Sequence, residues 1–476
     1  VGNYVVSGII LSTSEFATTE SPAPGFMPNV GNGYLAYDIG CPTEDASSSA
    51  GYMFVAGIYT GLDVVTPSHR ALIPQKHAYF IDSAEYNGVT MKNHTWMASL
   101  NIEKGVFTNT STFTDDVGTS CVIEMSWFAH RHLKEFSVLQ IIATSTDEKC
   151  RFKLQSCNAL ESNDVNEVSA SEQDGVFINV YETKEAETST GTLSRIMVTG
   201  SAVPNEFLGQ DSLVTLMGVH DVSVESEVAT QSFLNSYHSL DSTSFDDILK
   251  LHIEAWGELW ESGIEIAGND TIAASVNASY YYILSSLDET IEWSVSPGGL
   301  AKNSYNGHVF WDCETWMEPA VVPFYPGIAG AMSAYRLHRL GTAVQKAKSY
   351  GYKGAMIPWE SGFTGVDVTP TGNIEAEYEI HITADVALAM RMYSYFVSDS
   401  LNDPLYANLD YGYWEYIESC ATYLADRVTC ISPVEQTEKV KGLNACDSYS
   451  YLNVQPPDES GAYCLLCLTC TRDALF

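Results

Sequence analysis

The stretch from Phe310 to Trp316 combines large aromatic rings with carboxylates at close spacing. Phe310, Trp311 and Trp316 alternate there with Asp312 and Glu314. Sugar rings are apolar on their faces and polar at their edges, so aromatic rings can cover the faces while carboxylates accept hydrogen bonds from the hydroxyl groups. A soluble core rarely needs this combination. The stretch therefore predicts a carbohydrate site.

Two later stretches have the same character. Residues 351–362 contain Trp359 and Glu360 side by side, and residues 375–381 read EAEYEIH, which places acidic residues immediately before His381. Together with the first stretch, they predict a carbohydrate-active enzyme.

The order of these motifs resembles family 65 of the glycoside hydrolases, and in particular its branch that acts on collagen-type glycans. The resemblance extends over most of residues 29–445. The segments that carry it are GHVFWD (307–312) with the Trp-Met-x-Pro after it, GYKGAMIPWES (351–361), EIH (379–381), NGYL (32–35) and GIYTG…SHRALIP (57–74).

The resemblance implies an inverting α-glucosidase whose substrate is a glucosylated small molecule or glycopeptide, with glucosyl-galactosyl-hydroxylysine as the expected one. Such an enzyme uses an acid and a base whose carboxyl groups lie about 6.5–9.5 Å apart. Glu379 matches the family's general acid. We expect partial burial and the like charges of Glu375 and Glu377 to raise its pKa, so that it holds a proton near neutral pH. The alternative is that all three acids form a solvated helix start.

The same resemblance implies which residues hold the sugar. Trp311 and Asp312 match positions that hold the non-reducing glucose, and Trp359 and Glu360 match a second wall of the same pocket. His308 could donate a hydrogen bond to a hydroxyl group, and a buried structural role is the alternative.

The same resemblance implies less direct roles for three further residues. Glu314 is expected to support the site rather than to touch the sugar, and Asn32 and Arg70 to reach the pocket from substrate loops of the N-terminal region. Acid–base hydrolysis needs only two carboxylates and water, so neither a metal ion nor an organic cofactor is implied.

The catalytic base of the family lies beyond a Pro-Pro-Asp-Glu loop, which matches residues 456–459 here. Residues 461–476 match nothing expected after that loop, so we interpret residues 451–476 as an aberrant or truncated tail and expect the chain to lack the base and to have little or no activity. The alternatives are a disaccharide phosphorylase or acid trehalase of the same family, and a non-catalytic carbohydrate-binding fragment.

The pattern of apolar residues predicts a β-rich half followed by a helical half. Short β-branched runs such as 136–142, 151–155, 175–181 and 193–199 predict an N-terminal antiparallel β-sandwich over residues 1–235. Ser244 and Asp247 predict a helix N-terminus within a helical linker over 236–272, and its tryptophans are expected to serve packing. Helices near 273–288, 312–323, 328–350, 380–398 and 405–428 then predict a partial (α/α)6 toroid over 273–450.

The charge balance excludes some partners. The 476 residues include 60 Asp and Glu against 23 Lys and Arg, a net charge of −37. Nucleic acids and anionic membranes need basic patches, so neither is an expected partner. No apolar run reaches the roughly 20 residues of a membrane span. The sequence carries no signal for an oligomeric state.

The cysteines and glycosylation sequons leave the compartment open. The chain has 11 cysteines, an odd number without a regular spacing, and we expect most of them to be buried free thiols, which favours a reducing, cytoplasmic compartment. Asn-x-Ser/Thr sequons at Asn93, Asn109, Asn269 and Asn277 would permit glycosylation in the secretory pathway.

Overall fold

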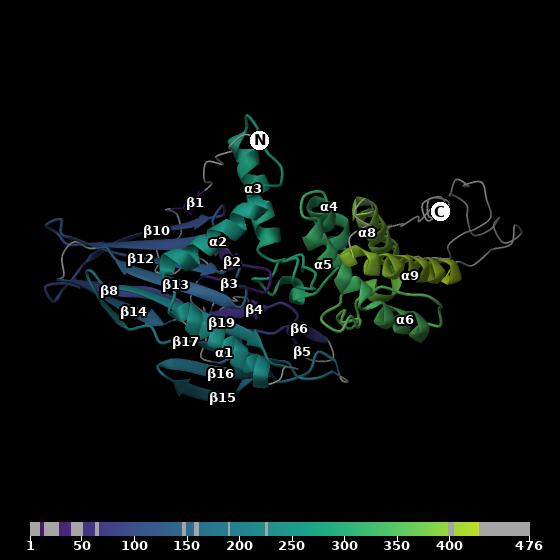
Figure 1. The fold of residues 1–476 in the computed structure, drawn as a ribbon, viewed down its shortest axis with the longest axis horizontal. Coiled ribbons are helices and arrows are strands. Elements are labelled where there is room, and N and C mark those ends of the chain that lie inside the picture. Colours follow the sequence, from purple (N-terminus) through teal and green to yellow (C-terminus); the bar gives the residue numbers. More distant parts are fainter. Residues whose placement is uncertain are drawn as a thin grey trace, which may run out of the picture. The chain divides into compact units, whose positions relative to one another are not determined.

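A computed structural model of the protein describes residues 10–13, 28–39, 51–61, 66–144, 149–156, 161–188, 191–223, 227–397 and 404–427. The chain divides into two compact units, one formed by Val1–Asp63 with Pro67–His308 and the other by Val64–Thr66 with Val309–Phe476. The first unit is rich in antiparallel sheet and the second is helical (Figure 1). This confirms the predicted change from strands to helices. The domain boundaries expected at residues 235 and 272 remain predictions, and the expected tail lies outside the described residues.

All strands of the first unit pair antiparallel, in one large sheet and three smaller ones (Figure 1). The large sheet has the order β1 (Ile10–Thr13), β10 (Asn93–Asn101), β11 (Val106–Thr114), β12 (Ser120–Ala129), β13 (Phe136–Ala143), β19 (Ser212–Asp221), β17 (Arg195–Ser201), β16 (Val176–Thr183), β15 (Val165–Gln173). The others are β18 (Glu206–Leu208), β14 (Cys150–Ser156), β8 (Tyr79–Tyr86), β9 (Val89–Thr90); then β2 (Asn29–Gly31), β3 (Leu35–Asp38), β4 (Tyr52–Val55), β7 (Ile73–Pro74); and β5 (Tyr59–Gly61), β6 (Ser68–Arg70).

The large sheet is covered on its two faces by different partners. Because side chains alternate along a strand, neighbouring residues of β12 point to opposite faces. Cys121 bonds to Cys150 of β14 in a neighbouring sheet, whereas Phe128 packs in a core cluster with Tyr237 and Ile248 of two helices. One face of the large sheet therefore packs against a second sheet, as a sandwich predicts, and the other face packs against helices.

Those two helices are α1 (Glu227–Asp241) and α2 (Phe245–Trp260), drawn beside the large sheet in Figure 1. The Ser244 side chain accepts a hydrogen bond from the Asp247 amide, which confirms the predicted N-terminus of α2. Trp256 is fully buried, as expected of a packing residue. The start of α1 at Glu227 was not expected, because the β pattern was extended to residue 235.

The helices of the second unit begin close to the expected positions. In chain order, the remaining helical elements are α3 (Asp270–Leu284) and η1 (Ser304–Gly307) in the first unit, and η2 (Cys313–Met317), α4 (Glu318–Val321), α5 (Pro326–Leu337), α6 (Leu340–Ser349), α7 (Glu375–Tyr378), α8 (His381–Val397), α9 (Pro404–Arg427) in the second. One long helix was expected over 328–350, but the chain breaks it between Leu337 and Leu340. None of the described helices is both long and apolar enough to span a membrane.

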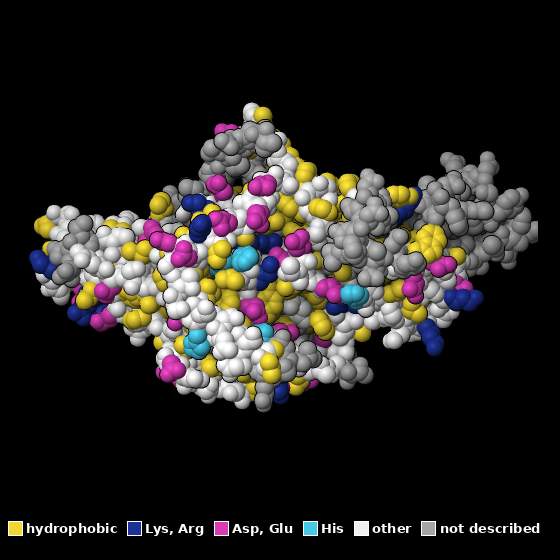
Figure 2. Space-filling model, in the orientation of Figure 1, with side chains coloured by type: hydrophobic (Ala, Val, Ile, Leu, Met, Phe, Trp, Pro, Cys, Tyr) yellow, Lys and Arg dark blue, Asp and Glu magenta, His cyan; other side chains and the backbone are white. Residues whose placement is uncertain are grey.

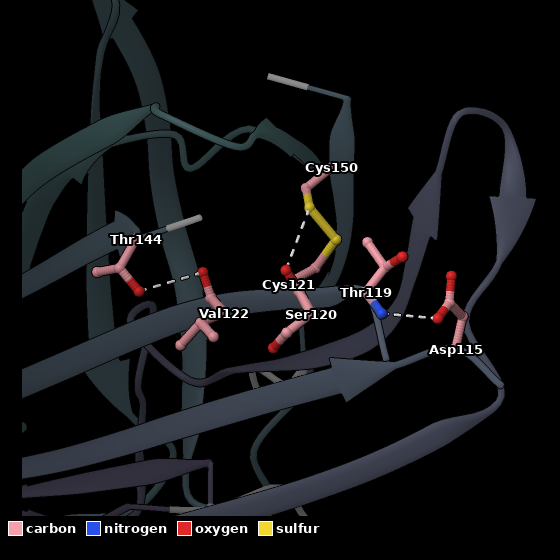
Figure 3. Close-up of a disulfide and its surroundings, with 7 residues drawn as sticks. All are labelled: Asp115, Thr119, Ser120, Cys121, Val122, Thr144 and Cys150. Carbon is pink, nitrogen blue, oxygen red and sulfur yellow. Dashed lines mark hydrogen bonds between the residues drawn. A yellow bond between two sulfur atoms is a disulfide. The ribbon is translucent and has the colours of Figure 1, made fainter. Parts of the chain in front are cut away.

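The described cysteines divide into a bonded pair and free thiols. Cys121 of β12 and Cys150 of β14 form a disulfide (Figure 3), so the prediction of free thiols is wrong for these two. It is confirmed for Cys313 and Cys420, whose buried thiols take part in no disulfide. The pairing could not be read from spacing, because it joins strands of two different sheets.

Acidic side chains are scattered over the face drawn in Figure 2 rather than gathered at one place. This distribution is what a solvated acidic surface gives, and it agrees with the charge balance of the chain.

The disulfide should contribute measurably to stability. Cys121 and Cys150 are 29 residues apart, and closing a loop of that length stabilises the folded state by roughly 3–4 kcal/mol. We expect the double substitution Cys121→Ser/Cys150→Ser to lower the urea midpoint, and dithiothreitol to lower the wild-type midpoint to the same value. The reductant should leave the double variant unchanged. A wild-type midpoint that does not respond to the reductant would contradict the assignment.

Candidate active site

The aromatic and acidic stretch that opened the sequence analysis forms an unusual helical turn. Asp312 precedes η2, a π-helix, which is a rare element that occurs often at functional sites. The indole of Trp316 is 65% exposed, and its ring centroid lies 6.1 Å from that of Trp311. Trp311 and Asp312 are half-buried. The turn therefore presents two tryptophans and a carboxylate close to the surface of the helical unit.

A buried arginine from α5 holds this turn. Arg336 donates from Nε to Glu314 Oε1 at 2.7 Å and from Nη2 to Glu314 Oε2 at 2.9 Å. The Arg336 and Glu314 side chains are 4% and 2% exposed. A bidentate arginine–carboxylate pair fixes direction as well as distance. This confirms that Glu314 supports the stretch from inside.

The same arginine joins the first stretch to the second. Arg336 also donates to the Phe310 carbonyl at 3.1 Å and to Ser361 Oγ at 3.3 Å. The main chains of Val309 and Ser361 exchange hydrogen bonds of 2.9 and 3.2 Å as an antiparallel bridge. The rings of Phe310 and Trp359 meet edge to face at 6.0 Å. Segments about 50 positions apart in the sequence are thus held side by side.

A buried lysine from α6 connects Asp367, just after the second stretch, to the third stretch. Lys346 Nζ lies 2.6 Å from Asp367 Oδ2 and donates to the Ala376 carbonyl of α7 at 3.1 Å. Burial lowers the pKa of Lys346, and the Asp367 carboxylate opposes that shift. The Ile357 amide also donates to Thr383 Oγ1 of α8 at 3.1 Å. All three stretches are therefore tied together within the helical unit.

The third stretch brings Glu379 to a histidine. Glu379 follows the short helix α7, and His381 is the first residue of α8. His381 Nε2 lies 2.6 Å from Glu379 Oε2, and its Nδ1 lies 2.5 Å from Asp385 Oδ2. The ring of Trp311 meets the His381 ring edge-on, with centroids 4.8 Å apart. Hydrogen bonding to Asp385, followed by the charges of Asp385 and Glu379, raises the pKa of His381 against the effect of burial.

Glu379 is partly buried, in keeping with the partial burial that the sequence interpretation expected. Its side chain is 40% exposed. Of the two nearby acids, Glu375 is half-buried and Glu377 is exposed. The carboxyl group is thus at the surface of the unit yet attached to His381, which differs from a freely solvated helix start.

The residues predicted to hold the sugar lie in different settings. Trp311 is joined to Glu379 through His381, and Trp359 is joined to the residue before Trp311. Glu360 is 5% exposed, and its main chain bonds to that of Val368. The sugar-binding roles of these residues remain proposals.

His308 belongs to the first unit and is used inside it. Its side chain is fully buried, Nε2 lies 2.9 Å from Ser68 Oγ, and the ring stacks on Tyr59 with centroids 5.8 Å apart. These contacts favour the structural alternative over a hydrogen bond to a sugar hydroxyl group. We therefore leave His308 out of the proposed sugar site.

Asn32 and Arg70 are also structural, which corrects the expectation that they reach a substrate. The Asn32 amide donates to two carbonyls, those of His130 at 3.0 Å and Lys134 at 2.8 Å. Arg70 donates to four carbonyl oxygens, those of Gly299, Leu300, Lys302, Gly307. Both side chains are buried and hold loops of the first unit in place.

Sequence reasoning missed the cations and the second acid of this site. Arg336, Lys346 and Asp385 lie outside the matched motifs, and only Asp385 carries a local signal, its position four residues after His381 on a helix. Among the described residues, no group of three or more His, Cys, Asp and Glu side chains is arranged to hold a metal ion.

A further carboxyl group is buried below the π-helix without a cation of its own. Glu318 is 1% exposed and accepts a hydrogen bond from Ser333 Oγ at 3.1 Å. Burial, together with the negative charge of Glu314, raises the pKa of Glu318 to about 8. The group is therefore protonated and neutral at pH 7.

Comparison with known proteins confirms the resemblance to family 65 of the glycoside hydrolases. The central catalytic domain of glycosyl hydrolase family 65 matches residues 280–409. A protein-glucosylgalactosylhydroxylysine glucosidase from Dictyostelium discoideum is 30% identical over 96% of this chain, and a kojibiose hydrolase from Mucilaginibacter mallensis is 37% identical over 43% of it. The chain spans 61% of the length of the first relative and 29% of the second.

A solved structure, described as a putative kojibiose phosphorylase from human microbiome, matches 85% of this chain and 55% of its own with a TM-score of 0.64. Its sequence identity is 16%, so this match is one of fold alone.

The buried pair of Arg336 and Glu314 gives a first prediction. Arg336→Met should lower the free energy of unfolding by about 3–5 kcal/mol, because it leaves the Glu314 carboxylate buried without a partner. Urea unfolding measures this value. The double variant Arg336→Met/Glu314→Leu should recover part of the loss. An unchanged midpoint for Arg336→Met would contradict the structure.

Glu318 gives a second prediction, on pH dependence. The folded state binds the proton of Glu318 more tightly than the unfolded state, whose pKa is the ordinary 4.5. The stability from this group is therefore fully present below pH 4.5 and is lost as the pH rises through 8, at about 1.4 kcal/mol per unit between the two. Glu318→Gln should remove this loss, so that its stability relative to wild type rises between pH 5 and pH 8.

Thermal unfolding at several pH values measures the effect. Glu415→Gln, at an exposed position of α9, is the matched control and should follow wild type. Parallel curves for wild type and Glu318→Gln would show that Glu318 does not hold its proton in the folded state.

Proposed function

Because the chain belongs to family 65 of the glycosyl hydrolases through its central catalytic domain, we propose that it binds the terminal glucose of an α-glucoside and hydrolyses the bond to the next group with inversion. Glu379 gives the proton to the departing oxygen. Trp311 covers one face of the glucose ring, Asp312 accepts hydrogen bonds from its hydroxyl groups, and Trp359 and Glu360 form a second wall of the pocket.

The observation that carries this proposal is the convergence of Glu379 and Trp311 on His381. An acid that protonates a glycosidic oxygen must reach the substrate while its orientation is fixed. Glu379 is 40% exposed and its Oε2 is held by His381, which leaves Oε1 to face a ligand. Trp311, in contact with the same histidine, supplies the apolar surface that a sugar face needs.

The reaction also needs a base that takes a proton from the attacking water. We assign no base among the described residues, because the proposal already uses Asp312 and Glu360 to hold hydroxyl groups. The chain spans 61% of the Dictyostelium relative, so the activity of the whole protein is part of the proposal.

The proposed substrate is a glucosylated glycan or glycopeptide, with glucosyl-galactosyl-hydroxylysine as the first to be tested. Relatives with hydrolase and with phosphorylase names both resemble the chain, so phosphate in place of water is the second candidate. A trehalase and a carbohydrate-binding protein without activity are the remaining alternatives. The proposed setting is an (α/α)6 toroid to which α5, α6, α8 and α9 contribute.

Two substitutions separate the proposed roles. In a protein that also carries the base, Glu379→Gln should lower turnover by roughly 10²–10⁴-fold while binding is retained, because it removes the proton but keeps the shape. Trp311→Ala should weaken binding of glucosyl-galactosyl-hydroxylysine by about tenfold, which corresponds to about 1.4 kcal/mol. Glucose release and calorimetry measure these two quantities.

The matched control is Trp414→Ala, which removes an exposed tryptophan of α9 that has no proposed role. Glucose release that depends on inorganic phosphate would indicate a phosphorylase instead of a hydrolase. Preferential cleavage of trehalose would indicate a trehalase. Binding without turnover that is lost in Trp311→Ala would support the binding protein. Unchanged binding and turnover in both variants would overturn the proposed site.

A further inference from the structure

His381 is clamped between two carboxylates and an indole. Its Nε2 lies 2.6 Å from Glu379 Oε2 and its Nδ1 lies 2.5 Å from Asp385 Oδ2. Trp311 meets the ring at an interplanar angle of 87°, so the imidazole has little freedom to turn. Asp385 lies four residues after His381 on the same face of α8, so the helix itself places the Asp385 carboxylate next to Nδ1.

We propose that His381 is a positioning residue for the acid. As an imidazolium held by Asp385, it donates a hydrogen bond from Nε2 to Glu379 Oε2. This hydrogen bond leaves Glu379 Oε1 for the departing oxygen and stabilises the carboxylate that remains after proton transfer. This inference rests on the proposed role of Glu379 and extends it to a group of three residues.

The hydrogen-bonding capacity of the three groups supports an extra proton. An ionised carboxylate only accepts hydrogen bonds, and a neutral imidazole has one donor and one acceptor nitrogen. With two ionised carboxylates, both contacts of His381 can be hydrogen bonds only if both ring nitrogens carry a proton. If the imidazole is neutral instead, one of the two carboxyl groups must carry the extra proton and donate the second hydrogen bond. Either way, the group binds one proton more than a neutral histidine with two carboxylates.

The charges around His381 favour the imidazolium. The charged groups against it among the described residues are Glu379, at the end of α7, and Asp385, on α8, and its third contact, Trp311, is uncharged. The pKa of His381 is raised, first through its hydrogen bond to Asp385. His381 therefore keeps its charge at a higher pH than an ordinary histidine.

The proton balance of the step is simple. As the bond from C1 to the glycosidic oxygen breaks, that oxygen takes the proton from Glu379 Oε1. Water adds to C1 and loses a proton to the carboxylate base that inversion requires, to which no described residue is assigned, and the base then releases this proton to solvent. Glu379 is left as a carboxylate facing the Nε2–H of His381, whose own proton stays in place. Glu379 then regains its proton from solvent. The benefit of His381 should be largest for a leaving group that depends on the acid.

Histidine titration by NMR on the chain with ¹³C-labelled histidines tests the contact without requiring turnover. The His381 signal is assigned by its loss in His381→Gln. We expect its midpoint to lie above the ordinary value of about 6.5 and to fall by about one unit or more in Glu379→Gln and in Asp385→Asn, because each removes a neighbouring negative charge. His238→Gln, at an exposed position of α1, is the matched control and should leave that signal unchanged.

A comparison of leaving groups tests the effect on the acid. Fluoride leaves without a proton, so His381→Gln should slow hydrolysis of the natural glucoside at least tenfold more than that of α-glucosyl fluoride. A His381 midpoint near 6.5 that does not change in Glu379→Gln would overturn the proposal. Equal decreases in the hydrolysis rates of the two substrates in His381→Gln would also overturn it. A wild-type chain that turns over neither substrate would count against the proposed activity, and the titration would still decide the role of His381.

Discussion

The buried ion pair of Arg336 and Glu314 is the interaction on which the geometry of the helical unit depends. Removing two charges from water costs several kcal/mol for each ion, so such a pair persists only where its geometry and its remaining hydrogen bonds are good. Here, the guanidinium uses Glu314 bidentately and reaches the Phe310 carbonyl and Ser361 as well. One side chain from α5 thereby sets the distance between two segments that carry proposed site residues.

The same cost of burying a charge explains the settings of Lys346 and Glu318. Lys346 of α6 binds Asp367 and the main chain of α7. It therefore holds the third segment in place, as Arg336 holds the first two. The two cations come from consecutive helices, and the break between Leu337 and Leu340 lets those helices have different directions. Glu318, close to Glu314, has no cation to itself and is neutral because burial holds its proton in place. Glu314 and Asp367 are thus paired with cations and Glu318 holds a proton, while Glu379 remains half-exposed.

The sequence predicted local features well, because local features depend on neighbouring residues. The run 136–142 became β13, and the N-cap at Ser244 was found because its hydrogen bond spans three residues. Glu379, Trp311 and Trp359 were selected by motif, and the structure attaches them to one helical unit. The motif could not separate residues that would touch a substrate from residues that hold the fold. Asn32, Arg70 and His308 were chosen on the same grounds, and their side chains are buried in the first unit.

Long-range pairings were beyond the sequence. Nothing near Arg336 signals that its partner is Glu314, 22 positions away on another helix, and nothing in the spacing of Cys121 and Cys150 signals a disulfide between two sheets. The coupling of Glu379 to His381 spans only two residues, yet it depends on the chain turning between α7 and α8 and on Trp311 from a distant segment. Such contacts are decided by tertiary packing.

The most direct test of this account is a crystal structure of the chain with 1-deoxynojirimycin, an uncleavable analogue of glucose. We predict that its ring lies on the face of Trp311, that Asp312 accepts from its hydroxyl groups, and that the Glu379 carboxyl group lies within about 3 Å of one of its polar atoms. A ring bound elsewhere, or bound with Glu379 turned away from it, would contradict the central claim that these three residues surround the glucose.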